Sequence, residues 1–180
     1  MNALMARRLM LICGSLRSGS TNEALLRTAV SLLPVDVTAD PYDGMSRLPH
    51  FNPDDDHEPL PPAVVDLRGR IAAADAILFS TPEYAGAMPG SLKNLLDWTV
   101  GGVETSDKPV AWINISTTGG ATKTHESLTT VLIYTGAKMI DAACVRIPVH
   151  RDAVGSNGLI EDPAVVAEIL AAVTALLDAA

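Results

Sequence analysis

The feature that most constrains this fold is a polar, glycine-containing segment between an apolar run and an amphipathic one. Residues 14–22 read Gly-Ser-Leu-Arg-Ser-Gly-Ser-Thr-Asn and follow the apolar run at 9–13. A short apolar run that ends at glycine is typical of a buried parallel strand. Beyond the polar segment, apolar side chains recur on one helical face, at Leu25, Leu26, Ala29, Leu32 and Leu33. The pattern predicts a strand, a loop and a helix.

The predicted loop has the chemistry of a phosphate-binding site. At the start of a helix, unpaired backbone N–H groups and the positive end of the helix dipole stabilise an anion. Arg17 adds a planar charged fork, and Gly14 and Gly19 allow the backbone to approach a ligand closely. The loop contains no carboxylate. Its hydrogen-bonding side chains are those of Ser15, Ser18, Ser20, Thr21 and Asn22.

Other phosphate loops do not match these residues. The Walker pattern requires a lysine where Ser20 stands, and the dinucleotide fingerprint requires a glycine where Leu16 stands. A tyrosine-phosphatase-like loop after Cys13 would need an arginine at the position of Gly19. The remaining alternative is that the polar residues only cap the helix and that Gly14 only forms the turn.

Length and charge bound the range of functions. A chain of 180 residues suits one domain, residues 1–180, and no linker or repeat divides it. The net charge of −8 argues against nucleic acid as a partner. The apolar runs are far shorter than the roughly 20 residues that cross a bilayer. We therefore expect no membrane insertion and a cytoplasmic location.

Two groups of reactive residues are expected to be structural. Cys13 and Cys144 fall in apolar runs without metal-ligand spacing, which predicts reduced cysteines in buried strands. The acidic residues at 54–58 are expected to remain solvated in a surface loop, because a hard cation needs a turn that converges several oxygens. We expect no metal.

Short apolar runs alternate with helical patterns along the rest of the chain. After an extended surface loop at 41–62, this alternation predicts a parallel sheet with helices on both faces. Strands are expected at 35–40, 76–80, 110–116 and within 138–148. Further helices are expected from 62, from 89, and at 123–135 and 163–177, the last with Val166, Ile169, Leu170, Val173 and Leu177 inward.

A second loop, at 81–89, follows the strand at 76–80. In open α/β sheets, ligands bind at the carboxyl ends of the strands, so this loop is expected beside the first one. Pro82 and Pro89 stiffen it, and Gly86 and Gly90 allow a flat ring to lie against backbone amides. The alternative is a proline-rich turn that places Trp98 in the core.

The two loops together resemble the NADPH-dependent FMN reductase family, which includes flavin-containing quinone and chromate reductases. The resemblance rests on residues 14–22, on Thr-Pro-Glu-Tyr at 81–84 and on Pro-Gly-Ser-Leu-Lys-Asn-Leu-Leu-Asp-Trp at 89–98. It extends over nearly the whole chain. It implies an α/β, flavodoxin-like three-layer sandwich, with a five-stranded parallel sheet of order 2-1-3-4-5 and helices on both faces.

The resemblance also implies the residues that contact the cofactor. The FMN phosphate would lie at Ser15, Arg17, Ser20, Thr21 and Asn22. The flavin ring would lie against Pro82, Glu83, Tyr84, Ala85 and Gly86. A third loop, with Thr117 and Gly119, resembles the family's glycine-containing turn beside the flavin, and a tight turn with a helix cap is the alternative.

This chain departs from the family in two places. The family usually has Asn-Gly-Ser after the tyrosine, where Ala85, Gly86 and Ala87 stand here, so a polar contact near the ring is missing. Thr99 and Val100 replace Ser-Arg at the family's usual subunit contact. We still expect a homodimer or homotetramer that buries the apolar residues of the helix from 89, namely Leu92, Leu95, Leu96 and Trp98.

The activity implied is an FMN-dependent oxidoreductase. Electrons would pass from NADPH or NADH through FMN to a small acceptor, such as free flavin or a quinone, by a ping-pong mechanism. Hydride transfer needs stacking and exclusion of water more than a protein acid or base, which agrees with a sequence that predicts no catalytic side chain. The alternatives are a flavodoxin-like electron carrier without nicotinamide activity and a phosphate-ligand protein that binds no flavin.

Overall fold

A parallel sheet forms the middle layer of the computed structural model, which describes residues 7–117 and 120–180. The central strands are β1 (Arg7–Cys13), β3 (Ala76–Ser80) and β4 (Pro109–Asn114), with β2 (Val37–Tyr42) at one edge. The other edge holds two short strands, β5 (Lys138–Met139) and β6 (Val145–Arg146), which both pair with β4. The order β2-β1-β3-β4-β5 confirms the predicted flavodoxin-like sheet.

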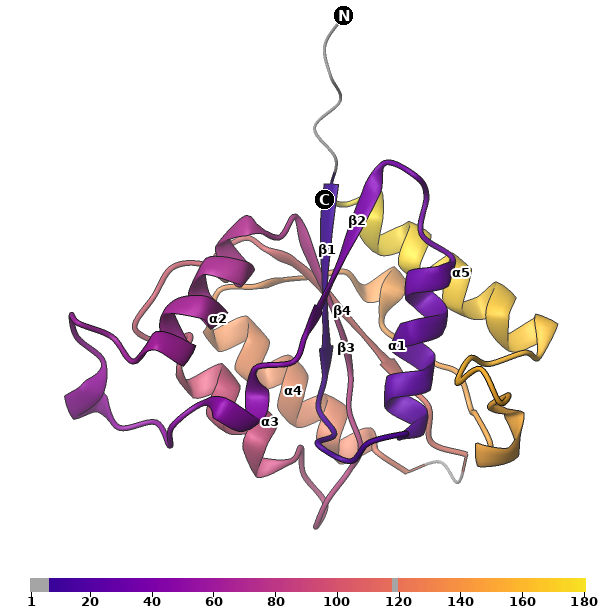
Figure 1. Ribbon diagram of the computed structural model, residues 1–180, viewed down its shortest axis with the longest axis horizontal. Coiled ribbons are helices and arrows are strands. Elements are labelled where there is room, and N and C mark those ends of the chain that lie inside the picture. The colour runs from indigo at the N-terminus through magenta and orange to yellow at the C-terminus, as the bar shows by residue number, and fades with distance from the viewer. Residues whose placement is uncertain (1–6, 118–119) are drawn as a thin grey trace, which may run out of the picture.

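Helices cover both faces of the sheet (Figure 1). On one face lie α1 (Thr21–Ser31) and α5 (Pro163–Leu177), and on the other lie α2 (Pro62–Ala73), α3 (Gly90–Asp97) and α4 (Thr122–Tyr134). Because side chains alternate along a strand, Leu9 and Leu11 of β1 pack into the first core, and Met10 and Ile12 pack into the second. A strand buried on both faces explains the continuous apolar run at 9–13.

The edge strands differ most from the prediction. β2 begins at Val37, two residues later than expected, and Val35 is fully exposed. β2 also includes Pro41. Proline has no backbone N–H to donate, and an edge strand tolerates it because such a strand has a neighbouring strand on only one side. The strand expected within 138–148 is broken into β5 and β6 by a single 3-10 turn. Such turns lie at Met45–Arg47, Pro53–Asp55, Asp141–Ala143 and Arg151–Ala153.

The long segment at 43–61 is anchored rather than freely solvated. Asp56, expected to be exposed with its acidic neighbours, accepts a hydrogen bond from Arg68 at 2.7 Å, and both side chains are largely buried. The same Arg68 donates from Nε to the carbonyl of Trp98 at 2.9 Å. Within the described residues, no group of three or more metal-ligating side chains comes together. The expectation of a solvated cluster is therefore wrong at Asp56, because a buried guanidinium needs a partner.

The apolar face of α3 is also placed differently from the expectation. Leu92, Leu95, Leu96 and Trp98 are all at most 1% exposed, because they fill the chain's own second core. They are therefore not free to bury in a subunit contact, and that interpretation of the helix is wrong. On α5, Leu170 is 43% exposed instead of inward, whereas Ile169 and Val173 are buried as predicted. None of the described helices combines the length and the apolar character that a membrane span requires.

Candidate active site

Three loops meet at the carboxyl edge of the sheet, after β1, β3 and β4. They surround a cavity of about 420 Å³, a size within the range of small-molecule sites. Its lining includes Asn22 of the first loop, Pro82 and Glu83 of the second, and Thr117 of the third. The remaining lining residues are Thr81, Asn114, Ile115, Ser116, Gly120, Ala121 and Val149. The structure thus brings part of each predicted loop to one cavity.

The first loop leaves β1 in close contact with the end of β3. Gly14 donates its backbone N–H to the carbonyl of Ser80 at 2.9 Å. A Cβ atom at Gly14 would lie 2.1 Å from Oγ1 of Thr81, so no larger residue fits without displacing one of the two loops. The glycine therefore fixes the distance between the first and second loops.

A serine and a glutamate of the first loop hold the start of α1. Oγ of Ser20 accepts the N–H of Glu23 at 3.2 Å, and Oε2 of Glu23 accepts the N–H of Gly19 at 2.8 Å. Gly19 has a φ of +63°, the left-handed conformation that glycine adopts without a steric cost. The loop itself contains no carboxylate, but the Glu23 carboxylate reaches it from the first turn of α1. The signal was present, because Ser20 and Glu23 have the serine-to-glutamate spacing of a capping box.

The other predicted phosphate residues differ in their surroundings. Arg17 is exposed and, among the residues that the structure describes, its guanidinium has no hydrogen-bond partner. Its backbone N–H donates to Oγ of Ser15 at 3.3 Å. Thr21 is the first residue of α1, so its N–H has no intrahelical acceptor. Asn22 is buried, and its Oδ1 accepts from Oγ of Ser80 at 2.9 Å, which ties α1 to β3.

The second loop contains a tight reverse turn. Tyr84 and Ala87 exchange two backbone hydrogen bonds, of 2.9 and 3.1 Å. The two residues between them, Ala85 and Gly86, have φ angles of +53° and +74°, as a type I′ turn requires. Residues 84–87 are exposed and lie outside the cavity lining. Of the residues of this loop predicted to face the flavin, Pro82 and Glu83 line the cavity and Tyr84, Ala85 and Gly86 do not.

Glu83 also connects the second loop to the third. Its Oε2 accepts the backbone N–H of Thr124 at 3.3 Å, in the first turn of α4. The carboxylate therefore lies at the positive end of that helix, where a negative charge is stabilised.

The third loop is organised by Asn114, which the sequence analysis did not single out. Its Oδ1 accepts the N–H of Ser116 at 2.9 Å, and its Nδ2 donates to the carbonyl of Gly120 at 3.3 Å. An asparagine that bonds to the backbone two residues later is a known turn device and was the available signal. Thr117 lines the cavity, whereas Gly119 lies outside the described residues.

His125 contacts the backbone of the third loop at Ala121 and lies outside the lining of the cavity. Its Nδ1 lies 2.5 Å from the carbonyl oxygen of Ala121, and its ring centroid lies 4.3 Å from that of Trp112. Burial lowers the pKa of His125, so the imidazole is neutral at pH 7. The neutral ring stabilises the backbone of the loop at Ala121.

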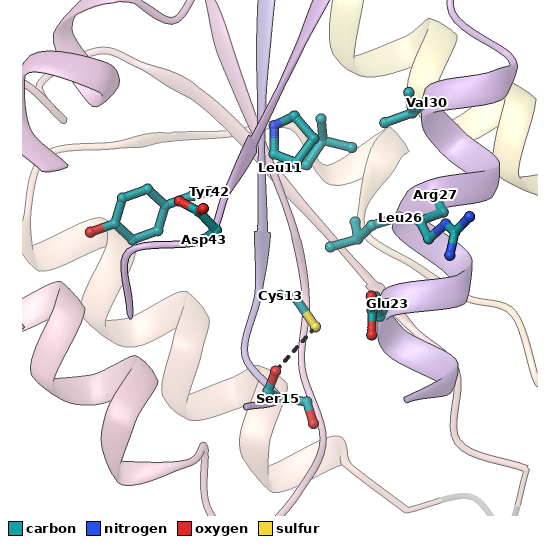
Figure 2. Close-up of a pocket in the computed structure, with 10 residues that line it drawn as sticks. Leu11, Cys13, Ser15, Glu23, Leu26, Arg27, Val30, Tyr42 and Asp43 are labelled. Carbon is teal, nitrogen blue, oxygen red and sulfur yellow. Dashed lines mark hydrogen bonds between the residues drawn. The ribbon is translucent and has the colours of Figure 1, made fainter. Parts of the chain in front are cut away.

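A separate groove lies on the other side of the first loop, between α1 and β2 (Figure 2). Its volume is about 270 Å³, and Leu11, Leu26 and Val30 form much of its wall. Cys13 is exposed to it, with Sγ 3.6 Å from the carbonyl oxygen of Ser15. Burial raises the pKa of the Cys13 thiol, which keeps it protonated and therefore a weak nucleophile. A smaller hollow of about 230 Å³ adjoins the loop on this side and includes Ser15 and Arg17.

This arrangement defines the class of protein. The sheet reverses its strand order between β1 and β3, and the loop predicted to bind phosphate follows β1 at that switch point, as in flavodoxin-like proteins. The flavoenzyme NAD(P)H:(acceptor) oxidoreductase of Paracoccus denitrificans superimposes with a TM-score of 0.83 over 96% of each chain, at 28% identity. The fold and the position of the switch point therefore both agree with a flavodoxin-like protein.

The chain belongs to the NADPH-dependent FMN reductase family, whose model matches residues 7–151. It is 37% identical over 157 residues to an NAD(P)H-dependent FMN reductase of Pseudomonas aeruginosa, covering 85% of this chain and 84% of the relative. It is 31% identical over 170 residues to a probable NADPH:quinone oxidoreductase of Oryza sativa subsp. japonica, covering 91% and 84%. The predicted family is confirmed. The protein is an oxidoreductase with FMN as cofactor and NAD(P)H as electron donor.

Proposed function

We propose that this protein passes electrons from NAD(P)H through FMN to a small acceptor, a quinone or a free flavin, in two separate half-reactions. The observation that carries the proposal is the single cavity at which the loops after β1, β3 and β4 meet. One cavity that admits donor and acceptor in turn favours a ping-pong mechanism. When bound, FMN supplies the hydride and electron chemistry, and the protein supplies orientation and exclusion of water.

The first loop fits the phosphate of this cofactor. Its helix start carries N–H groups without intrahelical acceptors, at Thr21 and Asn22. Arg17 is exposed, and its guanidinium has no partner within the described part of the chain. We therefore assign the phosphate to the predicted set, Ser15, Arg17, Ser20, Thr21 and Asn22. The hydrogen bonds of Ser20 and Asn22 use their side-chain oxygens as acceptors, so the Ser20 hydroxyl and the Asn22 amide group can still donate to a phosphate.

The second and third loops would hold the flavin ring and ribityl chain. Pro82 and Glu83 line the cavity directly, and Thr117 faces it from the third loop. Tyr84, Ala85, Gly86 and Gly119 complete the predicted set. Because Tyr84 is 54% exposed at the tip of the second loop, we assign it to the mouth of the site, where a flat acceptor would enter.

We also propose that the protein self-associates, as a homodimer or homotetramer. Since the apolar residues of α3 are in the core, the contact would use the exposed side chains near the end of that helix and of α4, Val100, Val103 and Tyr134. Light scattering after gel filtration tests this. A mass of two or four times 18.9 kDa is expected, and a monomer would contradict the proposal.

The experiment that tests the proposed function is an absorption spectrum of the protein, incubated with FMN and desalted, before and after anaerobic addition of NADPH. We expect retained flavin, bleaching by NADPH, and recovery of the oxidised spectrum when a quinone is added after the nicotinamide is removed. Retained flavin that NADPH does not bleach would favour an electron carrier. Failure to bind FMN would contradict the proposal at its first step.

A further inference from the structure

A carboxylate within reach of a phosphate loop needs an explanation, because it carries the same sign of charge as the ligand. Glu23 makes no ion pair among the described residues. Arg27, one helical turn along α1, donates instead to the carbonyl of Asn157 at 3.2 Å. The specific partner of the Glu23 carboxylate is the N–H of Gly19, at 2.8 Å.

Glu23 holds the loop at two points. Its backbone N–H donates to Oγ of Ser20 at 3.2 Å, and its side chain accepts from Gly19. Between these two bonds the chain turns through the left-handed conformation of Gly19, at a φ of +63°, and enters α1. The Glu23 side chain therefore contributes, together with that of Ser20, to the position and direction of the backbone amides at the helix start.

Glu23 reaches the loop from the side away from the cavity. Its side chain lines the groove between α1 and β2, as Figure 2 shows, and it also lines the hollow that adjoins this groove. The cavity between the three loops is lined by Asn22 but not by Glu23. Ser15 and Arg17 of the proposed phosphate set line the same hollow as Glu23, so the carboxylate lies beside part of that set and outside the cavity that the three loops line.

We propose that Glu23 is a positioning residue for the FMN phosphate. By accepting the Gly19 N–H, it fixes the loop in its binding conformation before the cofactor arrives, so that less conformational entropy is lost on binding. This inference rests on the proposed function of the cavity. In this role the Glu23 carboxylate acts as a hydrogen-bond acceptor and not through its negative charge. A variant that keeps the acceptor and removes the charge therefore distinguishes this role from electrostatic repulsion of the phosphate.

The test compares FMN dissociation constants, measured by quenching of flavin fluorescence, for the wild type, Glu23→Gln and Glu23→Ala. The amide of glutamine retains an oxygen that accepts the Gly19 N–H and removes the charge, whereas alanine removes both. We expect Glu23→Ala to weaken FMN binding about 10-fold, the effect of one lost hydrogen bond, and Glu23→Gln to stay within about threefold of the wild type. Glu168→Ala, an exposed carboxylate on α5, is the control for the change in net charge and should bind FMN as the wild type does.

A second measurement reports on the loop itself, without cofactor or activity. The hydrogen-exchange rate of the Gly19 amide in the FMN-free protein should rise in Glu23→Ala and remain close to the wild-type rate in Glu23→Gln. Equal losses of FMN affinity in both variants, or tighter binding in either, would overturn the positioning role. A wild-type protein that binds no FMN would instead contradict the proposed function.

Discussion

The first and second loops line the same cavity, and both turn through residues with a positive φ, but different residues and hydrogen bonds form the two turns. The first loop makes its left-handed turn at Gly19, and a serine and a glutamate hold both sides of that turn. The second loop makes a tighter turn, in which the first left-handed position is Ala85. Its side chains from 84 to 87 are exposed, and the turn is held by two backbone hydrogen bonds.

The difference separates a binding element from an adaptable one. The first loop places glycine where the backbone requires it, and two hydrogen bonds hold the turn on either side of that glycine, which favours a fixed conformation. An L-residue in the left-handed region costs about 1–2 kcal/mol, so the second loop carries strain at its exposed tip. We infer that cofactor affinity resides mainly in the first loop and that the second loop adjusts to the acceptor.

The largest expected effect comes from the contact between the two loops. Gly14→Ala would place a Cβ atom 2.1 Å from Oγ1 of Thr81, so the loops must separate. Overpacking of this kind should lower the free energy of unfolding by about 2–3 kcal/mol, measured by urea denaturation. Gly69→Ala is the matched control. Gly69 is exposed within α2, and a Cβ atom added there would meet no atom within 4 Å outside the helix's own backbone. This change should raise the free energy of unfolding by about 0.5–1 kcal/mol. A Gly14→Ala protein as stable as the wild type would contradict the close contact between the first and second loops.

The next effect isolates the charge of the first loop. Arg17→Ala should weaken FMN binding by about 1.5–3 kcal/mol, because charge-assisted hydrogen bonds to the phosphate are lost. Isothermal titration calorimetry with FMN measures it. Lys138→Ala, which removes the same charge from β5 at the opposite edge of the sheet, should leave the affinity unchanged. An unaltered FMN affinity in Arg17→Ala would contradict the assignment of the first loop to the FMN phosphate.

A smaller effect is expected from the cap of the first loop. Ser20→Ala removes the acceptor of the Glu23 N–H and should lower the free energy of unfolding by about 1 kcal/mol, measured in the absence of FMN. Ser91, near the start of α3, has no side-chain hydrogen bond among the described residues, and Ser91→Ala should change stability by less than about 0.5 kcal/mol. Equal effects at the two serines would show that the first loop is not held by its cap.

The smallest effect has the opposite sign and tests the strain in the second loop. Ala85→Gly should raise the free energy of unfolding by about 0.5 kcal/mol, because relief of the left-handed strain exceeds the entropy that glycine gains in the unfolded chain. Ala87→Gly, two residues along and without a positive φ, should lower it by a similar amount. Thermal unfolding of the two variants side by side decides the sign. Destabilisation by both would contradict a strained tip.

The central elements of the fold could be predicted because burial on both faces leaves a plain apolar pattern. The strand at Ala76–Ser80 and the helix at Pro163–Leu177 have the bounds that the sequence predicts. The bounds of the edge strands could not be predicted as well. β2 is partly exposed, so its sequence contains polar residues and Pro41 and lacks a continuous apolar pattern. At the far edge, the turn at Asp141–Ala143 interrupts a run that looks continuous in the sequence.

The candidate site shows the same division. Loops after strands β1, β3 and β4 could be placed at one edge from strand alternation alone, and they line one cavity. The partners of single side chains could not, because Glu83 bonds to Thr124 and Asp56 pairs with Arg68 across distances that no local pattern encodes. The bond from Gly19 to Glu23 is local, and its capping-box spacing was a readable signal.

The most direct test of one FMN site across three loops is amide chemical-shift mapping during a titration with FMN. We expect the amides within 14–22, 81–86 and 114–121 to shift together, with one midpoint, and those of Leu26 and Val30 in the groove beside α1 to shift little. Shifts confined to that groove, or different midpoints for the first and second loops, would contradict a single site formed by the three loops.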